Sequence, residues 1–119
     1  MSLTVLIVDD DPDVAGLLAF QLKRMDCVVH QVHNGKKAEA LASQATFDVI
    51  FLDIMMPVQD GYVTCKNLRS NGFSGKITMI SALPLDGNFE RARASGANDY
   101  LQKPVSRDTL ADYIETVTK

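Results

Sequence analysis

Acidic side chains follow two of the most apolar stretches of the sequence. Asp9, Asp10 and Asp11 come directly after the run Val5–Val8, and Asp53 comes directly after a second such run. Carboxylates held this close together repel one another, and an apolar setting makes their ionisation costlier still. Such an arrangement persists where a cation sits among the acids, or where one of the acids has a separate structural task.

Two further residues complete a set that could move a phosphoryl group. Asp9, Asp10 and Asp53 offer the hard oxygen ligands that suit Mg²⁺, an ion that keeps positions open for water or a phosphate oxygen. Asp53 stands alone in FLDIMMP, which suits a carboxylate nucleophile. Lys103 would add a second positive charge and Ser81 a hydroxyl hydrogen bond, so that catalysis would consist mostly of positioning and countercharge.

Taken singly, these residues also have ordinary structural explanations. Asp11 stands before Pro12 and is better explained as the N-cap of a helix than as a metal ligand. Lys103 could be a surface lysine in a turn, and Asp60 with Gly61 is most simply a turn and a helix start. The functional interpretation therefore depends on whether the fold brings the candidates together.

Apolar runs alternate with helical patterns along the chain, with no internal repeat and no low-complexity linker. The apolar runs predict five strands, at Leu3–Val8, Val28–Val32, Val49–Leu52, Lys76–Ile80 and Tyr100–Leu101. The periodic stretches predict helices that begin at Pro12, at Gly35, at about Gly61, at about Asp86 and after Ser106. The core stripe of the first helix is expected at Val14, Leu18, Leu22 and Met25. Gly87 and Asn88 predict a loosely held start for the fourth helix.

This alternation predicts an α/β fold: a doubly wound, five-stranded parallel sheet with helices on both faces. The common, flavodoxin-like strand order for five strands is 2-1-3-4-5, with a crevice between the first and third strands at their carboxyl ends. Asp9 and Asp10 leave the first strand, Asp53 the third and Ser81 the fourth, and Lys103 follows the fifth. The topology therefore predicts that all five meet on one rim.

Length and charge narrow the class of protein. The 119 residues are expected to form one domain, residues 1–119, large enough to bury a core without disulfides or structural metal. A net charge of −3 argues against a broad surface for nucleic acid or for an anionic membrane. No apolar run approaches membrane-spanning length, and no signal-peptide pattern is present at the start.

The cysteines and histidines suggest no further chemistry. Cys27 and Cys65 have no C-x-x-C spacing, which favours two free thiols in a reduced cytosol and hence a cytoplasmic location. His30 and His33 lack the nitrogen and sulfur partners that a zinc-type site requires.

Four motifs together resemble the receiver domains of two-component response regulators, and the single-domain chemotaxis regulator in particular. They are LIVDDDP, FLDIMMPVQDG, ISA and GANDYLQKP, in the order and spacing of that family and over essentially the whole chain. The resemblance implies that Asp53 is the phosphoacceptor. It also implies that Asp9 and Asp10 hold Mg²⁺, with Asp53 and the backbone carbonyl of Met55 as further ligands.

The resemblance extends to the switch and to the partners. It implies that Lys103 pairs with the phosphoryl group, that the Ser81 hydroxyl moves toward it, and that Tyr100 is the aromatic switch. The donor would be a histidine kinase or a histidine phosphotransfer protein, and the output a downstream protein or an attached domain. Helix four, strand five and helix five would form the output surface and the face of any dimer. The domain would promote its own phosphorylation and dephosphorylation without turning over an external substrate, and would contact neither nucleic acid nor membrane.

Small departures from the family pattern concern the loops around the site. Serine stands at position 81, where threonine is commoner, and Val105 stands where a larger apolar residue often follows the Lys-Pro pair. Met55 and Leu83 would flank the phosphoryl group, and both are apolar. Without a polar side chain to orient a water molecule, the acyl phosphate is expected to hydrolyse slowly; the alternative is that both side chains only fill the loops.

Three other classes of protein share some of these features: haloacid-dehalogenase-type phosphatases, flavodoxin-like cofactor-binding proteins and inactive receivers. Haloacid-dehalogenase-type phosphatases use a D-x-D motif after their first strand, and Asp9 and Asp11 have this spacing. However, Asp13 occupies the place of the usual Thr or Val, Pro12 would begin a helix too early, and Asp53 would have no role. A flavodoxin-like cofactor site is disfavoured because three carboxylates repel a phosphate and no glycine-rich nucleotide motif is present. The complete set of acids, hydroxyl and lysine argues against an inactive receiver.

Overall fold

The computed structural model describes residues 2–118. Met1 and Lys119, the outer limits of the domain predicted from the sequence, lie outside the described residues. Among those residues, no helix has both the length and the apolar character that crossing a membrane requires.

The predicted sheet is confirmed. Five parallel strands lie in the order β2-β1-β3-β4-β5. Their bounds are β1 Thr4–Val8, β2 Val28–Val32, β3 Val49–Leu52, β4 Lys76–Ser81 and β5 Asp99–Gln102. The helices between and after them are α1 Pro12–Lys23, α2 Gly35–Gln44, α3 Gly61–Ser70, α4 Asn88–Ser95 and α5 Arg107–Thr118.

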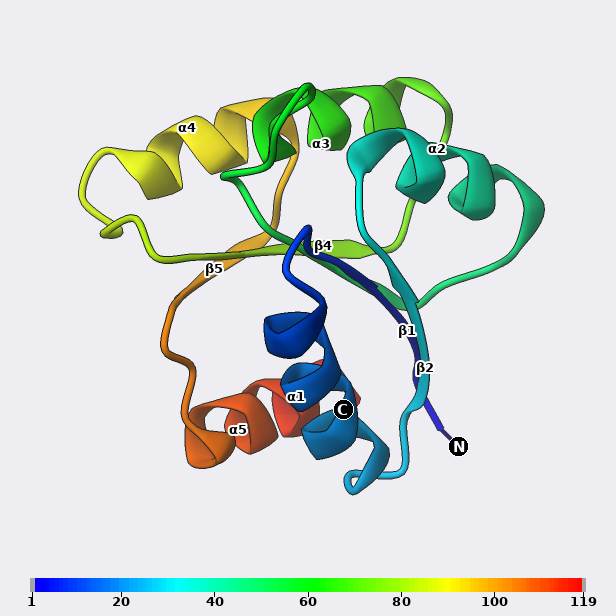
Figure 1. Ribbon diagram of the computed structural model, residues 1–119, viewed down its shortest axis with the longest axis vertical. Helices are drawn as coiled ribbons and strands as arrows, with labels where there is room; N and C mark the ends of the chain where they lie inside the picture. Colours follow the sequence, from blue (N-terminus) through cyan, green and yellow to red (C-terminus); the bar gives the residue numbers. More distant parts are fainter. Residues whose placement is uncertain (1, 119) are drawn as a thin grey trace.

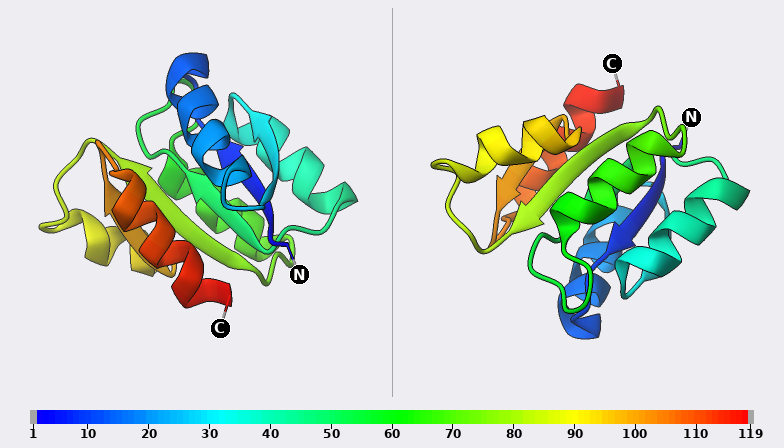
Figure 2. Two further views of the ribbon diagram at one scale, coloured as in Figure 1. Left: turned by 90° about the horizontal axis from the view of Figure 1, so that it is seen from below. Right: turned by 90° about the horizontal axis from the view of Figure 1, so that it is seen from above.

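Helices cover both faces of the sheet. In Figure 1, α2, α3 and α4 lie above it and α1 and α5 below it, and the two views of Figure 2 show each layer from its own side. Side chains of alternate strand positions divide accordingly: Leu6 and Ile50 belong to the core under α2, α3 and α4, whereas Val5 and Phe51 belong to the core with α1 and α5. All four residues of β3 are buried, as a strand covered on both faces must be.

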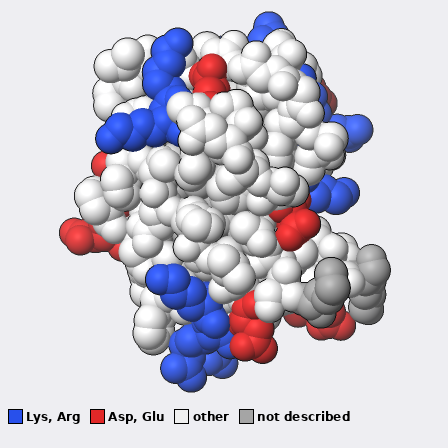
Figure 3. All heavy atoms as spheres, turned by 90° about the vertical axis from the view of Figure 1, so that its right-hand side faces the viewer, with Lys and Arg blue, Asp and Glu red and all other residues white. Residues whose placement is uncertain are grey.

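Figure 3 shows the side of the molecule that lies to the right in Figure 1. Lysine and arginine side chains occupy its upper and lower margins, acidic groups lie beside them, and the centre is uncharged. On this face the described residues, 2–118, form no continuous basic surface of the kind that binds nucleic acid.

Side-chain caps fix four of the helix starts as expected, that of α5 through Ser106, whose Oγ accepts the Thr109 N–H at 3.0 Å. Asp11 accepts hydrogen bonds from the N–H groups of Asp13 and Val14, which confirms it as the N-cap of α1. Asn34 and Asp60 cap α2 and α3 in the same way. Each cap satisfies N–H groups that would otherwise have no partner in the first turn.

Two sequence predictions about helices were wrong in detail. Of the stripe predicted for the first helix, Leu22 is buried and Leu18 and Met25 pack against the core, but Val14 is 37% exposed. Ala15 and Ala19 are buried on α1 in its place. The fourth helix begins at Asn88 rather than at Asp86. Its N-cap position is Gly87 at φ 76°, which offers no side chain to cap the first turn.

Gly61 is required where α3 meets the end of β3. A Cβ at this position would overlap the carbonyl oxygen of Asp53 and lie 2.7 Å from the Cα of Ile54, both of them backbone atoms that cannot move aside. We expect Gly61→Ala to lower the free energy of unfolding by about 1–3 kcal/mol, the usual cost of overpacking. Urea denaturation followed by circular dichroism measures the change.

Gly16, inside α1, is the matched control. A Cβ there has nothing within 4 Å, so Gly16→Ala should stabilise the protein by about 0.5–1 kcal/mol through the helix preference of alanine. Equal effects of the two substitutions would contradict the close approach at Gly61.

Candidate functional site

Two adjacent strands deliver the acids to one place. β1 and β3 are paired with Val8 opposite Leu52, and the pairing continues one residue further, since the Asp53 N–H donates to the Val8 carbonyl at 2.9 Å. Asp9 and Asp53 therefore leave the same edge of the sheet side by side. Asp9, Asp10 and Asp53 each place one carboxylate oxygen within 4.8 Å of the others.

This group of oxygens fits a magnesium ion. Asp9 and Asp53 are buried and Asp10 is exposed, so the pocket has fixed ligands on its inner side and access to water on its outer side. Mg²⁺ prefers few carboxylates and retains several of its waters. The donor set matches that preference, and the predicted Asp cluster is brought together as expected.

Lys103 contacts two of the three acids. It directly follows β5, and its N–H donates to the Ser81 carbonyl at 2.7 Å, which continues the β4–β5 pairing. Its Nζ lies 2.8 Å from Asp9 Oδ2 and 3.6 Å from Asp53 Oδ2. Burial by itself lowers the pKa of the Lys103 ammonium, but the hydrogen bond to Asp9 and the charges of Asp53 and Asp9 outweigh it, so that the pKa is raised and the ammonium stays charged.

Asp53 is held in a setting that opposes its ionisation. Burial, the largest cause, raises its pKa to about 6; the charge of Lys103 lowers it, Asp9 and Asp10 raise it, and a hydrogen bond from the Met55 N–H lowers it. That hydrogen bond joins Met55 N to Asp53 Oδ1 at 3.4 Å. A cation that offsets the carboxylate charge, or a covalent bond formed at Asp53, would therefore reduce the free-energy cost of burying that charge.

Ser81 and Tyr100 lie next to the acids and are linked to each other through a loop. Ser81 is fully buried at the end of β4, and its Oγ accepts a hydrogen bond from the Leu83 N–H at 3.2 Å. The Tyr100 hydroxyl donates to the Leu83 carbonyl at 2.8 Å, and its ring meets the edge of Phe89 on α4. A change at Ser81 would thus reach α4 through Leu83 and Tyr100.

One residue near the site had no role in the sequence prediction. His33, directly after β2, places its Nδ1 3.0 Å from the Asp9 carbonyl and so supports the backbone that presents Asp9. In the sequence analysis, His33 was examined only as a possible metal ligand and was not placed near Asp9. The pairing of Val8 with Val32 is the signal that could have placed it beside Asp9.

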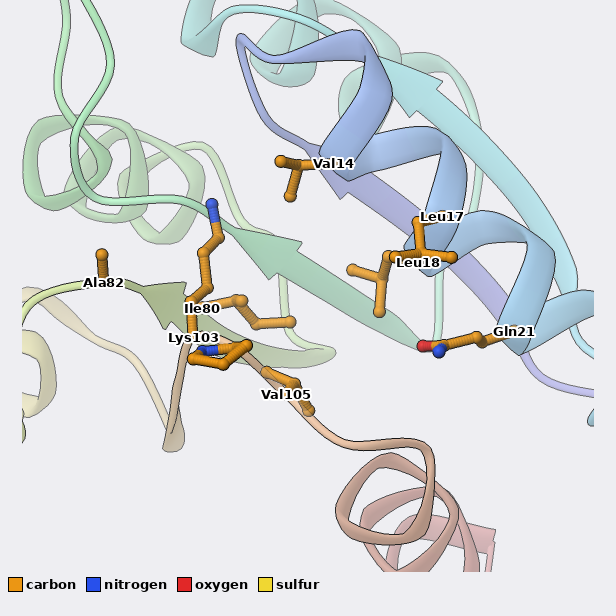
Figure 4. A pocket seen from close by; sticks show the side chains of 9 residues that line it. Val14, Leu17, Leu18, Gln21, Ile80, Ala82, Lys103 and Val105 are labelled. Atoms are coloured by element: carbon orange, nitrogen blue, oxygen red, sulfur yellow. The ribbon is translucent and has the colours of Figure 1, made fainter.

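An apolar groove adjoins the acids on the α1 side. It has a volume of about 420 Å³ and lies between α1 and the segment that follows β5, and Lys103 is one of the residues that line it. In Figure 4, Val14, Leu17 and Leu18 of α1 face Val105 across it. Leu17 is 62% exposed, so apolar surface reaches solvent directly beside the candidate site.

Comparison with known proteins agrees with the geometry. Residues 5–115 match the family described as the response regulator receiver domain. The DNA-binding dual master transcriptional regulator RpaA of Synechocystis sp. is 36% identical over 102 residues, which cover 84% of this chain and 42% of RpaA. The chain spans less than half the length of RpaA, and the same holds for the curated relatives ResD of Bacillus subtilis and PleD of Caulobacter vibrioides.

Solved structures give the same result. The receiver domain of the Francisella response regulator 1452 has a TM-score of 0.91 at 31% identity, covering 99% of this chain and 100% of that one. The receiver domain of the sensor histidine kinase PA1611 of Pseudomonas aeruginosa PAO1 has a TM-score of 0.89 at 29% identity, with both chains covered completely. The latter structure is described as having a magnesium ion coordinated in its active-site cleft.

The raised pKa of Asp53 predicts how stability depends on pH in the metal-free protein. Between pH 3.8 and about 6 the folded state holds a proton on Asp53 that the unfolded chain releases. Wild-type stability should therefore fall as pH rises through this window, because the unfolded state binds fewer protons there. Asp53→Asn has no carboxylate that must ionise while buried. Above about pH 6.5 its free energy of unfolding should therefore exceed that of the wild type, and below about pH 4 the two values should approach each other.

Urea denaturation in the presence of a chelator, repeated across this pH range, measures the difference. A difference between the two proteins that does not vary with pH would contradict the burial of an ionised Asp53.

Proposed function

The chain belongs to the response regulator receiver domain family, phosphoacceptor switches of two-component signal transduction, and on that premise we propose that Asp53 is the residue that accepts the phosphoryl group. The observation that supports this most strongly is that Asp53 lies close both to two further acids and to the Lys103 ammonium. We assign residues 1–119 to this one domain, and the family match at residues 5–115 lies within it.

The chemistry is an in-line transfer to a carboxylate. An Asp53 oxygen attacks the phosphorus of a phosphohistidine, and the new O–P bond forms as the P–N bond breaks. The P–N electron pair stays on the ring, which leaves as neutral imidazole because its other nitrogen carries a proton. A dissociative transition state requires mainly position and countercharge. β3 supplies the position, because Asp53 is fixed by its N–H bond to Val8 and by Met55 at its Oδ1.

Lys103 and Ser81 act on the oxygens of the transferred group. Lys103 Nζ already lies within 3.6 Å of Asp53, so the ammonium can pair with a phosphoryl oxygen there. Ser81 Oγ accepts the Leu83 N–H and lies within hydrogen-bond reach of the Tyr100 hydroxyl, so its own hydrogen can turn from Tyr100 to the phosphoryl group. That donation would draw Ser81 and Leu83 toward Asp53, and Tyr100 would follow as the switch because it is bonded to the Leu83 carbonyl.

Receiver domains hold Mg²⁺ at an acidic site. In this chain Asp9, Asp10, Asp53 and the backbone carbonyl of Met55 would hold it. When bound, the ion supplies positive charge to the oxygens of the phosphoryl group. Asp9 would then exchange its present partner, the Lys103 ammonium, for the metal, and the ammonium would become available to the phosphoryl group.

The phosphoryl donor would be a histidine kinase or a histidine phosphotransfer protein. The signal would pass from this domain to a downstream protein or to an output domain. A donor protein has to cover the mouth of the pocket, and the groove beside Lys103 is exposed apolar surface that adjoins it. The face formed by α4, β5 and α5 would carry the output and any dimer contact. We further propose that the protein is cytoplasmic and that this domain does not contact nucleic acid.

The phosphatase alternative loses its main support. That mechanism needs both acids of the D-x-D motif at the site, but the Asp11 carboxylate caps α1, and Pro12 begins that helix directly afterwards. Asp53 rather than Asp11 joins Asp9 and Asp10.

Labelling with phosphoramidate, a small P–N donor, tests the acceptor. Asp53→Asn should abolish the mass gain of one phosphoryl group, and Lys103→Ala should retain part of it while weakening the shift of α4 amide NMR signals on phosphorylation. Asp11→Asn is the matched control, since asparagine caps a helix as well as aspartate does, and it should be labelled like the wild type. Full labelling of Asp53→Asn would overturn the assignment.

The lifetime of the phosphoryl group provides a second test. Met55 is 59% exposed beside Asp53, whereas Leu83 packs against the core, so only Met55 can be changed without disturbing the packing. We expect Met55→Asn to speed loss of the phosphoryl group by about tenfold, because an amide can orient the attacking water. Met55→Leu, which adds no polar group, should decay like the wild type. Rapid decay of the wild type itself, within seconds, would contradict the slow-hydrolysis hypothesis.

A further inference from the structure

The loop between β3 and α3 contains a strained turn. The Gln59 N–H donates to the Pro57 carbonyl at 2.7 Å, which closes a γ-turn, and the central residue Val58 has φ 70°. This is the rare form of the γ-turn, and a β-branched residue is especially unfavourable in it. The Val58 side chain is fully exposed, so it gains nothing from packing. Contacts made by other residues must hold the loop in this shape.

The side chain of Gln59 makes such contacts. It is buried, and its Nε2 donates to Glu39 Oε2 at 2.6 Å and to Thr64 Oγ1 at 2.9 Å. These two hydrogen bonds use both N–H groups of the amide. Glu39 lies on α2 and Thr64 on α3, so one side chain ties the loop to two helices. The bond to the Glu39 carboxylate is charge-assisted and hence the stronger of the two.

The surroundings are shaped to admit this amide. Gly35 opens α2, and a Cβ there would overlap the Thr64 hydroxyl and lie 2.7 Å from Gln59 Nε2. The Thr64 hydroxyl in turn donates to the Asp60 carbonyl at 2.9 Å, so it also holds the last residue of the loop. Asn67 Nδ2 also donates to that Glu39 oxygen, at 3.1 Å, but from α3 rather than from the loop.

The opposite end of the loop lies at the acids. Met55 N donates to Asp53 Oδ1, and the Gly61 N–H donates to the Ile54 carbonyl at 2.8 Å, so the two ends of the loop are joined across its base. Ile54 and Met56 are buried and anchor the first half of the loop by packing. The second half has the Gln59 amide as its buried side-chain anchor.

We propose that Gln59 is a positioning residue for the metal site: its bonds to Glu39 and Thr64 hold the strained loop so that the backbone of Met55 stays beside the acids. The proposal rests on the proposed function in one respect, the assignment of the Met55 carbonyl as a metal ligand. Gln59 itself touches neither the metal nor the phosphoryl group. Its loss would widen the range of loop positions and so weaken metal binding, without altering the acids.

A titration of the wild type and three variants with MgCl₂, followed through the amide NMR signals of Asp9 and Asp53, tests this. Gln59→Met keeps the length of the side chain and removes its donors; we expect the affinity for Mg²⁺ to fall by about tenfold, the lower end of the effect of residues that orient metal ligands. Amide hydrogen exchange at Met56 and Gly61 should become faster. Thr64→Val, a milder break in the same network, should change both quantities in the same direction by less.

Asn67→Leu is the matched control. It removes the other amide donor to Glu39, but from α3 rather than from the loop, so it should lower thermal stability and leave the affinity for Mg²⁺ unchanged. Two outcomes would overturn the positioning role of Gln59 and leave the metal site standing. One is an equal affinity for Mg²⁺ in the wild type and Gln59→Met, and the other is an equal loss of that affinity in Gln59→Met and Asn67→Leu. A wild type whose Asp9 and Asp53 signals do not respond to Mg²⁺ would overturn the metal site and with it the proposed function.

Discussion

The structure depends on one electrostatic constraint: three carboxylates meet at the carboxyl edge of a parallel sheet, where burial makes the charge of Asp53 costly. The Lys103 ammonium, 2.8 Å from Asp9 and 3.6 Å from Asp53, offsets part of that cost. Compensation is incomplete, because Asp53 still has a raised pKa. A further cation is therefore favoured at this edge, and it would compete with Lys103 for the Asp9 carboxylate. Such competition would link metal binding to the freedom of the lysine.

The segments that leave this edge of the sheet are held to very different degrees. The loop after β3 is fixed by buried apolar side chains and by the Gln59 amide between α2 and α3. The loop after β4 has fewer constraints: α4 has eight residues, and its N-cap Gly87 offers no side chain. Asp53 thus borders the more firmly anchored loop, and the proposed path from Ser81 through Tyr100 leads to the start of α4, where a side-chain cap is missing.

Much of the fold and of the site could be predicted because it depends on local pattern. Alternating apolar runs and helical periods determine a parallel sheet, and residues directly after its strands must meet at one edge; Asp9, Asp10, Asp53 and Lys103 were found in this way. The errors arose where two local solutions are nearly equal. The stripe of α1 could begin at Val14 or one residue later, and packing against the sheet decided for the later one.

The sequence by itself therefore determined which elements form, their order in the sheet, and which acids share an edge, because each follows from hydrophobic periodicity and from the geometry of parallel strands. Only the tertiary structure decided which polar groups touch. The Lys103 ammonium reaches Asp9 across 94 positions of sequence, and the Gln59 amide enters the space between two helices. Such contacts form only when the elements are placed relative to one another to within a few tenths of an ångström. Residue types and spacing do not specify that placement.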